Sequence, residues 1–293
     1  MKQLKIAIFA QLSSPTITQQ LAPLLRERGH TVDIVDLSII PHEGFIEHPE
    51  IQNLACYDIA YYRSGLEPDN NAERITQLEA FLKKHSVQTV NLHYTQHPRA
   101  NSKTYETQLA KINGLTVPKS IYDTPADFVA LTSQLGLPFI MKTEYGTHGS
   151  GVHMIKNAEE FTQVTKSYPN TRFLHQQFIS HDFEYRVHVV NGEVMCIWRK
   201  APDTNDFRSN EAQGGKMLVT NPLHTTEITK LAKKVFTIFG FDIFVVDFML
   251  EKNTDTFYFT EINLNPGWVN TINEVTPFNR SAIAADYFEE ICS

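Results

Sequence analysis

The order of the apolar segments constrains the fold of this chain more than any other feature of its sequence. Up to about residue 95, short apolar runs alternate with helical stretches, which is typical of parallel strands joined by crossover helices. The predicted strands are Lys5–Ala10, Thr31–Asp36, Asp58–Tyr62 and Gln88–Leu92, with a helix over Asn71–Lys84. From about Asn101 this alternation ends. We therefore expect an α/β and α+β protein that begins with a parallel α/β lobe.

The region after Asn101 contains signals for antiparallel hairpins. Asn191-Gly192 separates the predicted strands Glu184–Val190 and Glu193–Arg199, and this dipeptide is typical of two-residue turns with positive φ at both positions. A second hairpin is predicted near the end of the chain. The other predicted elements are helices over 102–113, 158–167 and 226–239 and strands over 139–142 and 152–155.

The second hairpin brings two carboxylates together. Its predicted strands are Asp242–Leu250 and Thr256–Asn263. Symmetric pairing about Thr254 places Asp247 opposite Glu261, with Cβ atoms roughly 5 Å apart, and alternation places Asn263 on the same face. Mg²⁺ prefers such oxygen ligands, so the three residues are candidate metal ligands. The alternative is that one carboxylate is solvated or paired with a Lys or Arg.

A lysine followed by a glycine-rich segment is the second candidate site. Lys142 ends a predicted strand, and Gly146, Gly149 and Gly151 follow it closely. Glycines let backbone N–H groups approach phosphate oxygens, and a lysine supplies compensating charge. The arrangement differs from both the Walker loop and the Rossmann fingerprint. The alternative is an ordinary loop.

A basic, amide-rich segment is the third candidate site. It contains Arg199-Lys200, Asp206-Phe-Arg208-Ser-Asn210 and Gly214-Gly215. Guanidinium groups suit bidentate binding of carboxylate or phosphoryl oxygens, whereas the alternative is a solvated loop with incidental charges. Together, the three segments supply the groups that phosphoryl transfer requires.

The charge and composition of the chain argue against several classes of function. A formal charge of −7 and a pI near 5.9 argue against general binding to nucleic acid or anionic membranes. No apolar stretch is long enough to span a bilayer. The cysteines, Cys56, Cys196 and Cys292, form no CxxC motif and suit a reducing compartment. We therefore expect a cytoplasmic protein.

Taken together, these segments resemble the ATP-grasp enzymes, and most closely the RimK-like carboxylate–amine ligases. The resemblance covers about residues 100–288. Its most specific parts are Asp206-Phe-Arg-Ser-Asn210 with Gly214-Gly215, and Thr260-Glu-Ile-Asn263 with Asn265-Pro-Gly267. It implies an ATP-grasp fold, in which two α+β subdomains grip ATP, after the N-terminal lobe. The implied domains are 1–98, 99–178 and 179–293.

The resemblance also implies which residues bind the nucleotide. Two lysines hold the phosphates, the glycine loop closes over the triphosphate, and a linker reads the adenine edge. Gln177, in that linker, stands where an acidic residue is usual in the family. The acidic-x-Arg strand places Glu184 at the ribose and Arg186 toward the phosphates or substrate. The implied set is Lys103, Lys142, Gly146, Gly149, Ser150, Gly151, Gln176, Gln177, Phe178, Ile179, Glu184 and Arg186.

The family's Mg²⁺ ligands match Asp247, Glu261 and Asn263, in agreement with the hairpin argument. Two ions are expected, with Mn²⁺ as an alternative metal. The motif that contains Arg208 and Asn210 is implied to line the acyl-phosphate and substrate pocket, with Arg199 as a companion.

The resemblance implies an ATP-dependent ligase that activates a carboxylate as an acyl phosphate and joins it to an amine, releasing ADP and phosphate. The expected partners are small-molecule or peptide substrates, without nucleic acid or membrane; a homodimer is consistent with the relatives. One alternative is a phosphotransferase or ATPase on the same fold. Another is a non-catalytic nucleotide-binding regulatory protein.

Overall fold

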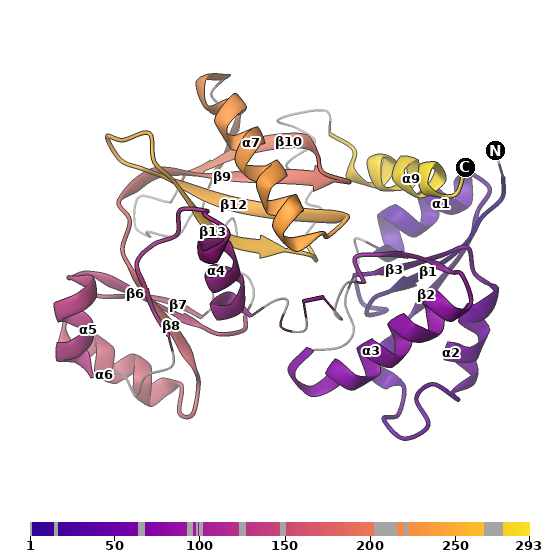
Figure 1. Ribbon diagram of the computed structural model, residues 1–293, viewed down its shortest axis with the longest axis horizontal. Helices are drawn as coiled ribbons and strands as arrows, with labels where there is room; N and C mark the ends of the chain where they lie inside the picture. The colour runs from indigo at the N-terminus through magenta and orange to yellow at the C-terminus, as the bar shows by residue number, and fades with distance from the viewer. Residues whose placement is uncertain are drawn as a thin grey trace.

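The computed structural model describes residues 2–14, 17–63, 68–92, 96–97, 99, 102–122, 127–146, 151–201, 216–219, 222–266 and 278–293. Within these ranges the chain forms one parallel sheet and two largely antiparallel sheets, arranged along the long axis of the molecule (Figure 1). The predicted mixture of α/β and α+β structure is confirmed.

The first lobe is a parallel sheet with helices on both faces. Its strands lie in the order β2-β1-β3-β4. They are β1 (Lys5–Phe9), β2 (Thr31–Val35), β3 (Ile59–Tyr62) and β4 (Gln88–Val90). The helices are a π-helical turn (Ile17–Leu21), α1 (Ala22–Glu27), α2 (Pro49–Asn53) and α3 (Pro68–Lys84), with short 3-10 turns at Leu37–Ile39 and Leu54–Cys56. All four predicted strands and the predicted helix are confirmed.

The central sheet has the strand order β5-β8-β6-β7. Its strands are β5 (Ser120–Ile121), β6 (Phe139–Thr143), β7 (Val152–Ile155) and β8 (Phe173–Gln177). Helices α5 (Phe128–Leu135) and α6 (Ala158–Ser167) cover one face with a small core of their own. The segment 175–179 was expected to be a linker between the two ATP-grasp subdomains. The strand β8 occupies its first three residues.

The C-terminal sheet has five strands in the order β11-β10-β9-β12-β13. They are β9 (His181–Val190), β10 (Glu193–Ala201), β11 (Lys216–Val219), β12 (Ile243–Glu251) and β13 (Phe257–Asn263). At the predicted β9–β10 turn, Asn191 and Gly192 have φ of 48° and 76°. Helices α4 (Lys103–Ile112) and α7 (Pro222–Phe239) pack on the apolar face of this sheet. Its opposite face carries the charged residues.

The last helix, α9 (Arg280–Ile291), returns to the first lobe and packs beside α1 (Figure 1). Its Phe288 ring lies 5.4 Å from the ring of Tyr61 in β3, within a core built from both ends of the chain. Asn91, after β4, joins the same lobe to the C-terminal sheet, because its side chain donates to the carbonyl of Ile243 (2.6 Å) and accepts from the N–H of that residue (2.8 Å).

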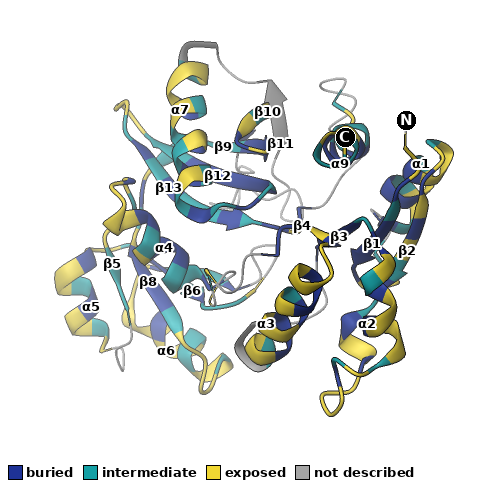
Figure 2. Cartoon of the chain, turned by 45° about the vertical axis from the view of Figure 1, so that its right-hand side comes forward, coloured by how far each residue is buried: buried dark blue, intermediate teal, exposed yellow. Residues whose placement is uncertain are grey.

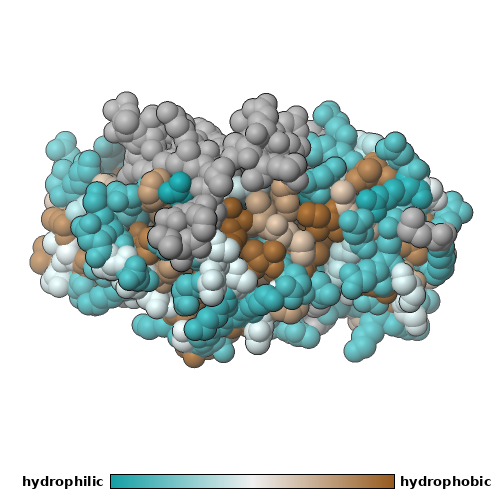
Figure 3. All heavy atoms as spheres, turned by 90° about the horizontal axis from the view of Figure 1, so that it is seen from above, coloured by the Kyte–Doolittle hydropathy of each residue, from teal (hydrophilic) through white to brown (hydrophobic). Residues whose placement is uncertain are grey.

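Burial follows these layers. The strands β1, β3 and β12 are mostly buried, whereas the outer faces of α3 and α7 are exposed (Figure 2). The face shown in Figure 3 is largely hydrophilic where it is described, with apolar side chains near its middle. In the part of the chain that the structure covers, none of the helices has the length and apolarity needed to cross a membrane.

Candidate active site

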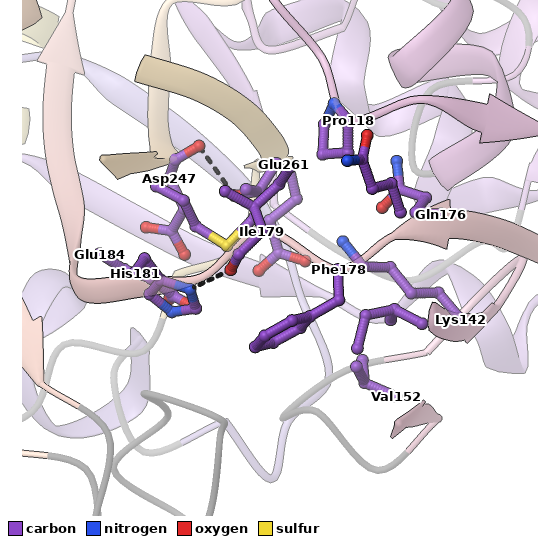
Figure 4. A pocket seen from close by; sticks show the side chains of 14 residues that line it. Pro118, Lys142, Val152, Gln176, Phe178, Ile179, His181, Glu184, Asp247 and Glu261 are labelled. Carbon is purple, nitrogen blue, oxygen red and sulfur yellow. Dashed lines mark hydrogen bonds and ion pairs between the residues drawn. The ribbon is translucent and has the colours of Figure 1, made fainter. Parts of the chain in front are cut away.

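A pocket lies between the central and C-terminal sheets, on the faces that the helices leave uncovered. It encloses about 700 Å³ that no atom fills, part of it open to solvent. Figure 4 shows side chains from both sheets directed into it. The lining residues are Pro118, Ile140, Lys142, Val152, Gln176, Gln177, Phe178, Ile179, His181, Glu184, Asp247, Met249, Thr260 and Glu261.

The predicted pairing in the last hairpin is confirmed: Asp247 lies opposite Glu261. Leu250 pairs with Phe257, so the turn is centred between Asn253 and Thr254 and not at Thr254 as expected. A β-bulge at Thr260 adds one residue to β13 and restores the pairing, and the Thr260 hydroxyl donates to the carbonyl of Asp247 at 2.8 Å. Because a bulge changes which face later residues occupy, it determines that Glu261 faces the pocket.

The strand registers arrange the polar face of the C-terminal sheet in three cross-strand rows. The first row is Lys200, Glu184 and Met249. The second row is Trp198, Arg186, Asp247 and Glu261. The third row is Cys196, His188, Val245 and Asn263. Members of the first two rows line the pocket.

Asp247 is buried and neutralised by two basic side chains. Arg186 donates to both carboxylate oxygens, at 2.9 and 2.6 Å, and the Lys200 ammonium lies 3.0 Å from the second oxygen. Burial would raise the pKa of Asp247, but the two cations lower it by more, so the group stays ionised. The pairing with Lys and Arg that was weighed as an alternative to metal binding is therefore present at this residue.

Glu261 differs from Asp247 in its surroundings. Among the described residues its carboxylate has no hydrogen-bond or ion-pair partner. Asn263, in the third row, accepts a hydrogen bond from the N–H of Asn265 at 2.9 Å through its side-chain oxygen. The described part of the chain holds no group of three or more His, Cys, Asp and Glu side chains suited to a metal ion, since the predicted set combines two carboxylates with an amide.

Glu184, a member of the first row, and His181 line one end of the pocket. Lys200 lies 2.8 Å from one carboxylate oxygen of Glu184, and the His181 Nε2 lies 3.6 Å from the other. Burial opposes ionisation of Glu184, but Lys200 and His181 hold its pKa well below the usual range. The Nδ1 of His181 lies 2.8 Å from the carbonyl oxygen of Ile179. His181 was not predicted, because a single histidine carries no motif.

Lys142 reaches the pocket from the central sheet. Its position in β6 is fixed by pairing with Val152 and Leu174, and its side chain extends toward the side of the pocket that Glu261 lines (Figure 4). Burial lowers the pKa of Lys142, and the nearby Glu261 carboxylate opposes that shift. The ammonium therefore lies in a site where an anionic ligand would stabilise its charge.

Lys103 begins α4, and its ammonium donates to the carbonyl of Gly146 at 3.0 Å. Gly151 lies so close to Thr143 that a Cβ atom would be 2.0 Å from its hydroxyl oxygen, so only glycine fits there. The two predicted residues between these glycines, Gly149 and Ser150, lie outside the described residues.

The predicted adenine-reading residues lie at the junction of the two sheets. Gln176 is buried and donates to the Ser120 hydroxyl at 3.0 Å. The N–H of Gln177 donates to the carbonyl of Lys119 at 2.9 Å. Phe178 and Ile179 complete this wall of the pocket. All four predicted residues are therefore brought to the pocket.

The structure does not bring Arg199 to the pocket. Its guanidinium lies 4.6 Å from the centre of the Phe183 ring, on the other face of β10 from Lys200. A bulge between Val194 and Cys196 places Lys200 opposite Glu184, and without it Arg199 would take that place. The sequence therefore favoured Arg199 as a site residue, whereas Lys200 is the one that lies on this face. Arg208 and Asn210 lie outside the described residues.

A buried lysine, a charged sheet face and a pocket between two sheets define a protein of the ATP-grasp type. The chain belongs to the RimK-like ATP-grasp domain family, which matches residues 100–282. It is 28% identical, over 90% of both chains, to a probable alpha-L-glutamate ligase of Xanthomonas euvesicatoria pv. vesicatoria. The predicted class, ATP-dependent carboxylate–amine ligation, is confirmed at the level of this family.

Solved structures with the same fold support the assignment. The ATP-grasp ligase PsnB complexed with minimal precursor has a TM-score of 0.71 and 16% identity, with 99% of each chain covered. The N5-carboxyaminoimidazole synthetase from Staphylococcus aureus, complexed with ADP, has a TM-score of 0.72 and 18% identity, over 94% of this chain and 74% of that one. The predicted ATP-grasp fold is confirmed.

Proposed function

We propose that this protein transfers the γ-phosphoryl group of ATP to a carboxylate and then joins the resulting acyl group to an amine. The acyl phosphate forms as ADP leaves. The amine nitrogen then attacks the activated carbonyl, phosphate departs, and the amine loses a proton to give an amide. The observation that carries this proposal is the pocket between two sheets in which Lys142 faces the carboxylates of Glu184, Asp247 and Glu261, with Arg186 and Lys200 paired to Asp247 beside it.

In this proposal, different residues in and beside the pocket bind different parts of the nucleotide. Lys142 and Lys103 bind the phosphates, and the glycine segment covers them. The wall of Gln176, Gln177, Phe178 and Ile179 holds the base, and Glu184 holds the ribose. Arg186 lies on the phosphate side, where it also fixes Asp247. Exclusion of water by these walls protects an acyl phosphate from hydrolysis.

Charge in the pocket supports a divalent cation. Lys142, Arg186 and Lys200 are balanced by Glu184, Asp247 and Glu261, so these groups alone do not neutralise a triphosphate. Glu261, which lacks a partner among the described residues, and Asn263 and Asp247 would hold the ion. Mg²⁺ there would neutralise charge on the transferred phosphoryl group. We propose two ions, with Mn²⁺ as an alternative.

For the acyl-transfer step, we propose Arg208 and Asn210 as the residues beside the acyl phosphate. The predicted companion, Arg199, is replaced in this proposal by Lys200, which lies on the pocket face. L-Glutamate is the proposed amino-acid substrate, because the relatives are named as glutamate ligases. We further propose three domains, 1–98, 99–178 and 179–293, a cytoplasmic location, a homodimer, and no nucleic-acid or membrane partner.

The test is ADP release with Mg-ATP and a panel of amino acids, dipeptides and basic protein tails, with hydroxylamine present to trap an acyl phosphate. Hydroxamate formation is expected with a particular carboxylate. ADP without hydroxamate would instead support the phosphotransferase or ATPase. Nucleotide binding without ADP would support the regulatory protein. Lys142→Met should lose at least a hundredfold in rate, whereas Lys156→Met, at an exposed site outside the pocket, should retain it.

A further inference from the structure

His181 connects two walls of the pocket. It is the first residue of β9, and its side chain is only 5% exposed. A carbonyl oxygen only accepts hydrogen bonds, so the Nδ1 of His181 carries a proton and donates to Ile179, in the wall proposed to hold the base (Figure 4). The Nε2 lies 3.6 Å from one carboxylate oxygen of Glu184, the proposed ribose residue. One imidazole therefore lies between the proposed base and ribose sites.

The Nε2 atom of His181 is buried without a hydrogen bond. It is closed to solvent, and none of the described residues supplies it with a hydrogen-bond partner. The 3.6 Å to Glu184 is longer than a hydrogen bond, but charge attraction acts over this distance and is stronger where water is excluded. Burial lowers the pKa of His181, and the Glu184 carboxylate raises it by more. These surroundings favour an imidazolium that faces Glu184.

The carboxylate of Glu184 is therefore held from two sides. The Lys200 ammonium lies 2.8 Å from its other oxygen, and Lys200 is itself fixed by Asp247 at 3.0 Å. A carboxylate has about four lone-pair sites, so these two contacts leave sites that can accept from the hydroxyl groups of a ligand in the pocket. Without His181, only one oxygen would be held, and the last torsion of a glutamate side chain is broad.

We propose that His181 is a positioning residue that orients Glu184 to accept hydrogen bonds from the ribose hydroxyls, so that the pocket selects ribonucleotides over deoxyribonucleotides. This inference rests on the proposed nucleotide site. Because Ile179 fixes the same ring, the base wall and the ribose carboxylate share one support. Hydrogen bonds from hydroxyls to a carboxylate held in this way contribute about tenfold to a hundredfold in affinity.

The competing explanation is that His181 only fastens the junction of β8 and β9 through Ile179. Two variants each keep one donor. His181→Asn keeps an amide near the Nδ1 position, toward Ile179, whereas His181→Gln keeps one near the Nε2 position, toward Glu184. His181→Phe keeps the ring and loses both nitrogens. The matched control is His85→Phe, because His85 is exposed in the first lobe, with its ring centre 4.5 Å from that of Phe81.

The test measures the Kd for Mg-ADP and for Mg-2′,3′-dideoxy-ADP, which lacks both ribose hydroxyls, by titration calorimetry. We expect the unmodified protein to bind Mg-ADP at least tenfold more tightly than the dideoxy nucleotide. His181→Phe and His181→Asn should reduce this ratio below threefold, through weaker binding of Mg-ADP. His181→Gln should recover part of the ratio, and His85→Phe should keep all of it.

The unmodified protein tests the inference even where a variant fails to fold, since equal affinity for the two nucleotides would overturn it. An unchanged ratio in His181→Phe would also overturn the positioning role, even if both nucleotides bound more weakly. So would a ratio restored by His181→Asn and not by His181→Gln. The measurement needs no turnover and is independent of the ADP-release assay. Failure of the unmodified protein to bind Mg-ADP would instead overturn the proposed function, and this inference with it.

Discussion

Asp247 and Glu261 face each other across two strands, yet they differ in what neutralises them. Asp247 is held by Arg186 and Lys200, whereas Glu261 has no ion-pair partner among the described residues. In the proposed function both carboxylates serve the metal site, but only Asp247 also stabilises the sheet through ion pairs. The two roles should separate on substitution.

Glu261→Gln should raise the Mg²⁺ concentration needed for half-maximal ADP release about tenfold, because it removes a charged ligand, and leave the Tm nearly unchanged. Asp247→Asn should also lower the free energy of unfolding by about 3–5 kcal/mol, because it removes the carboxylate that neutralises Arg186 and the buried Lys200. Magnesium titrations and thermal unfolding of both variants test this. Equal effects of the two variants on the Tm would contradict it.

His175, in β8, predicts a dependence of stability on pH. Burial lowers its pKa to about 4, so between pH 4 and about 6.5 the unfolded chain binds more protons than the folded protein, and stability falls as the pH falls through this range. By pH 5 the loss is about 2 kcal/mol. His175→Leu should reduce the fall in Tm between pH 7 and pH 5, while the part due to His188, whose pKa is also lowered by burial, remains. His42→Leu, at an exposed position, should leave that change intact.

At the scale of the element, two β-bulges determine which side chains enter the pocket. The bulge at Thr260 brings Glu261 opposite Asp247, and the irregularity between Val194 and Cys196 brings Lys200 opposite Glu184. If the same residues paired in a regular ladder, Thr260 would lie opposite Asp247 and Arg199 would lie opposite Glu184. The site therefore depends on the irregular positions of otherwise regular strands.

Deletion of Met195 should remove the second bulge but keep Lys200 opposite Glu184, because Val194 and Cys196 then pair in a regular ladder with Val189 and His188, so ADP release should fall less than tenfold. Met195→Ala should stay within about twofold of the unmodified rate, because Met195 is partly exposed and the backbone irregularity remains. Activity and circular dichroism are measured together. A folded deletion variant that has lost at least a hundredfold in ADP release would contradict this register.

The same elements show how far the sequence predicts the fold. Local patterns were sufficient for the parallel strands, for the Asn191-Gly192 turn and for the pairing of Asp247 with Glu261. They did not predict α5, the two-residue strand β5 or the strand β8, which occupies part of the expected linker. Short strands carry too few residues for periodicity, and bulges depend on neighbouring strands, so Lys200 could not be distinguished from Arg199.

The site residues also differ in whether the sequence predicts them. Those with a local motif, such as Lys142 after its strand and the linker around Gln177, could be predicted and lie at the pocket. His181 could not, because a single histidine carries no motif.

At the scale of the whole molecule, the first lobe and the C-terminal sheet form one unit. A single buried cluster includes Phe9 and Leu78 from the lobe and Val187 and Phe259 from the sheet. The central sheet has a separate core under α5 and α6, built from Leu131, Leu135, Phe139, Met141, Ile155 and Phe161. Because the pocket lies between these two units, a bound nucleotide would contact both.

Hydrogen exchange should therefore be faster in β6, β7 and β8 than in β9 and β12, since the smaller core opens at lower cost. Mg-ADP should slow exchange most in the central sheet, where Lys142 and Gln176 face the pocket. Mass spectrometry of peptic peptides, with and without Mg-ADP, measures both rates. Uniform exchange across the sheets, or protection confined to β9 and β12, would contradict this division.

The packing of α9 on the first lobe affects how the chain is made. Tyr61 and the neighbouring residues of the parallel sheet are covered in part by Ala284, Ala285 and Phe288, which a ribosome adds more than two hundred residues later. Throughout synthesis that apolar surface lacks its native cover and is available to chaperones and to other nascent chains. The native cover of this surface forms only when α9 has left the exit tunnel.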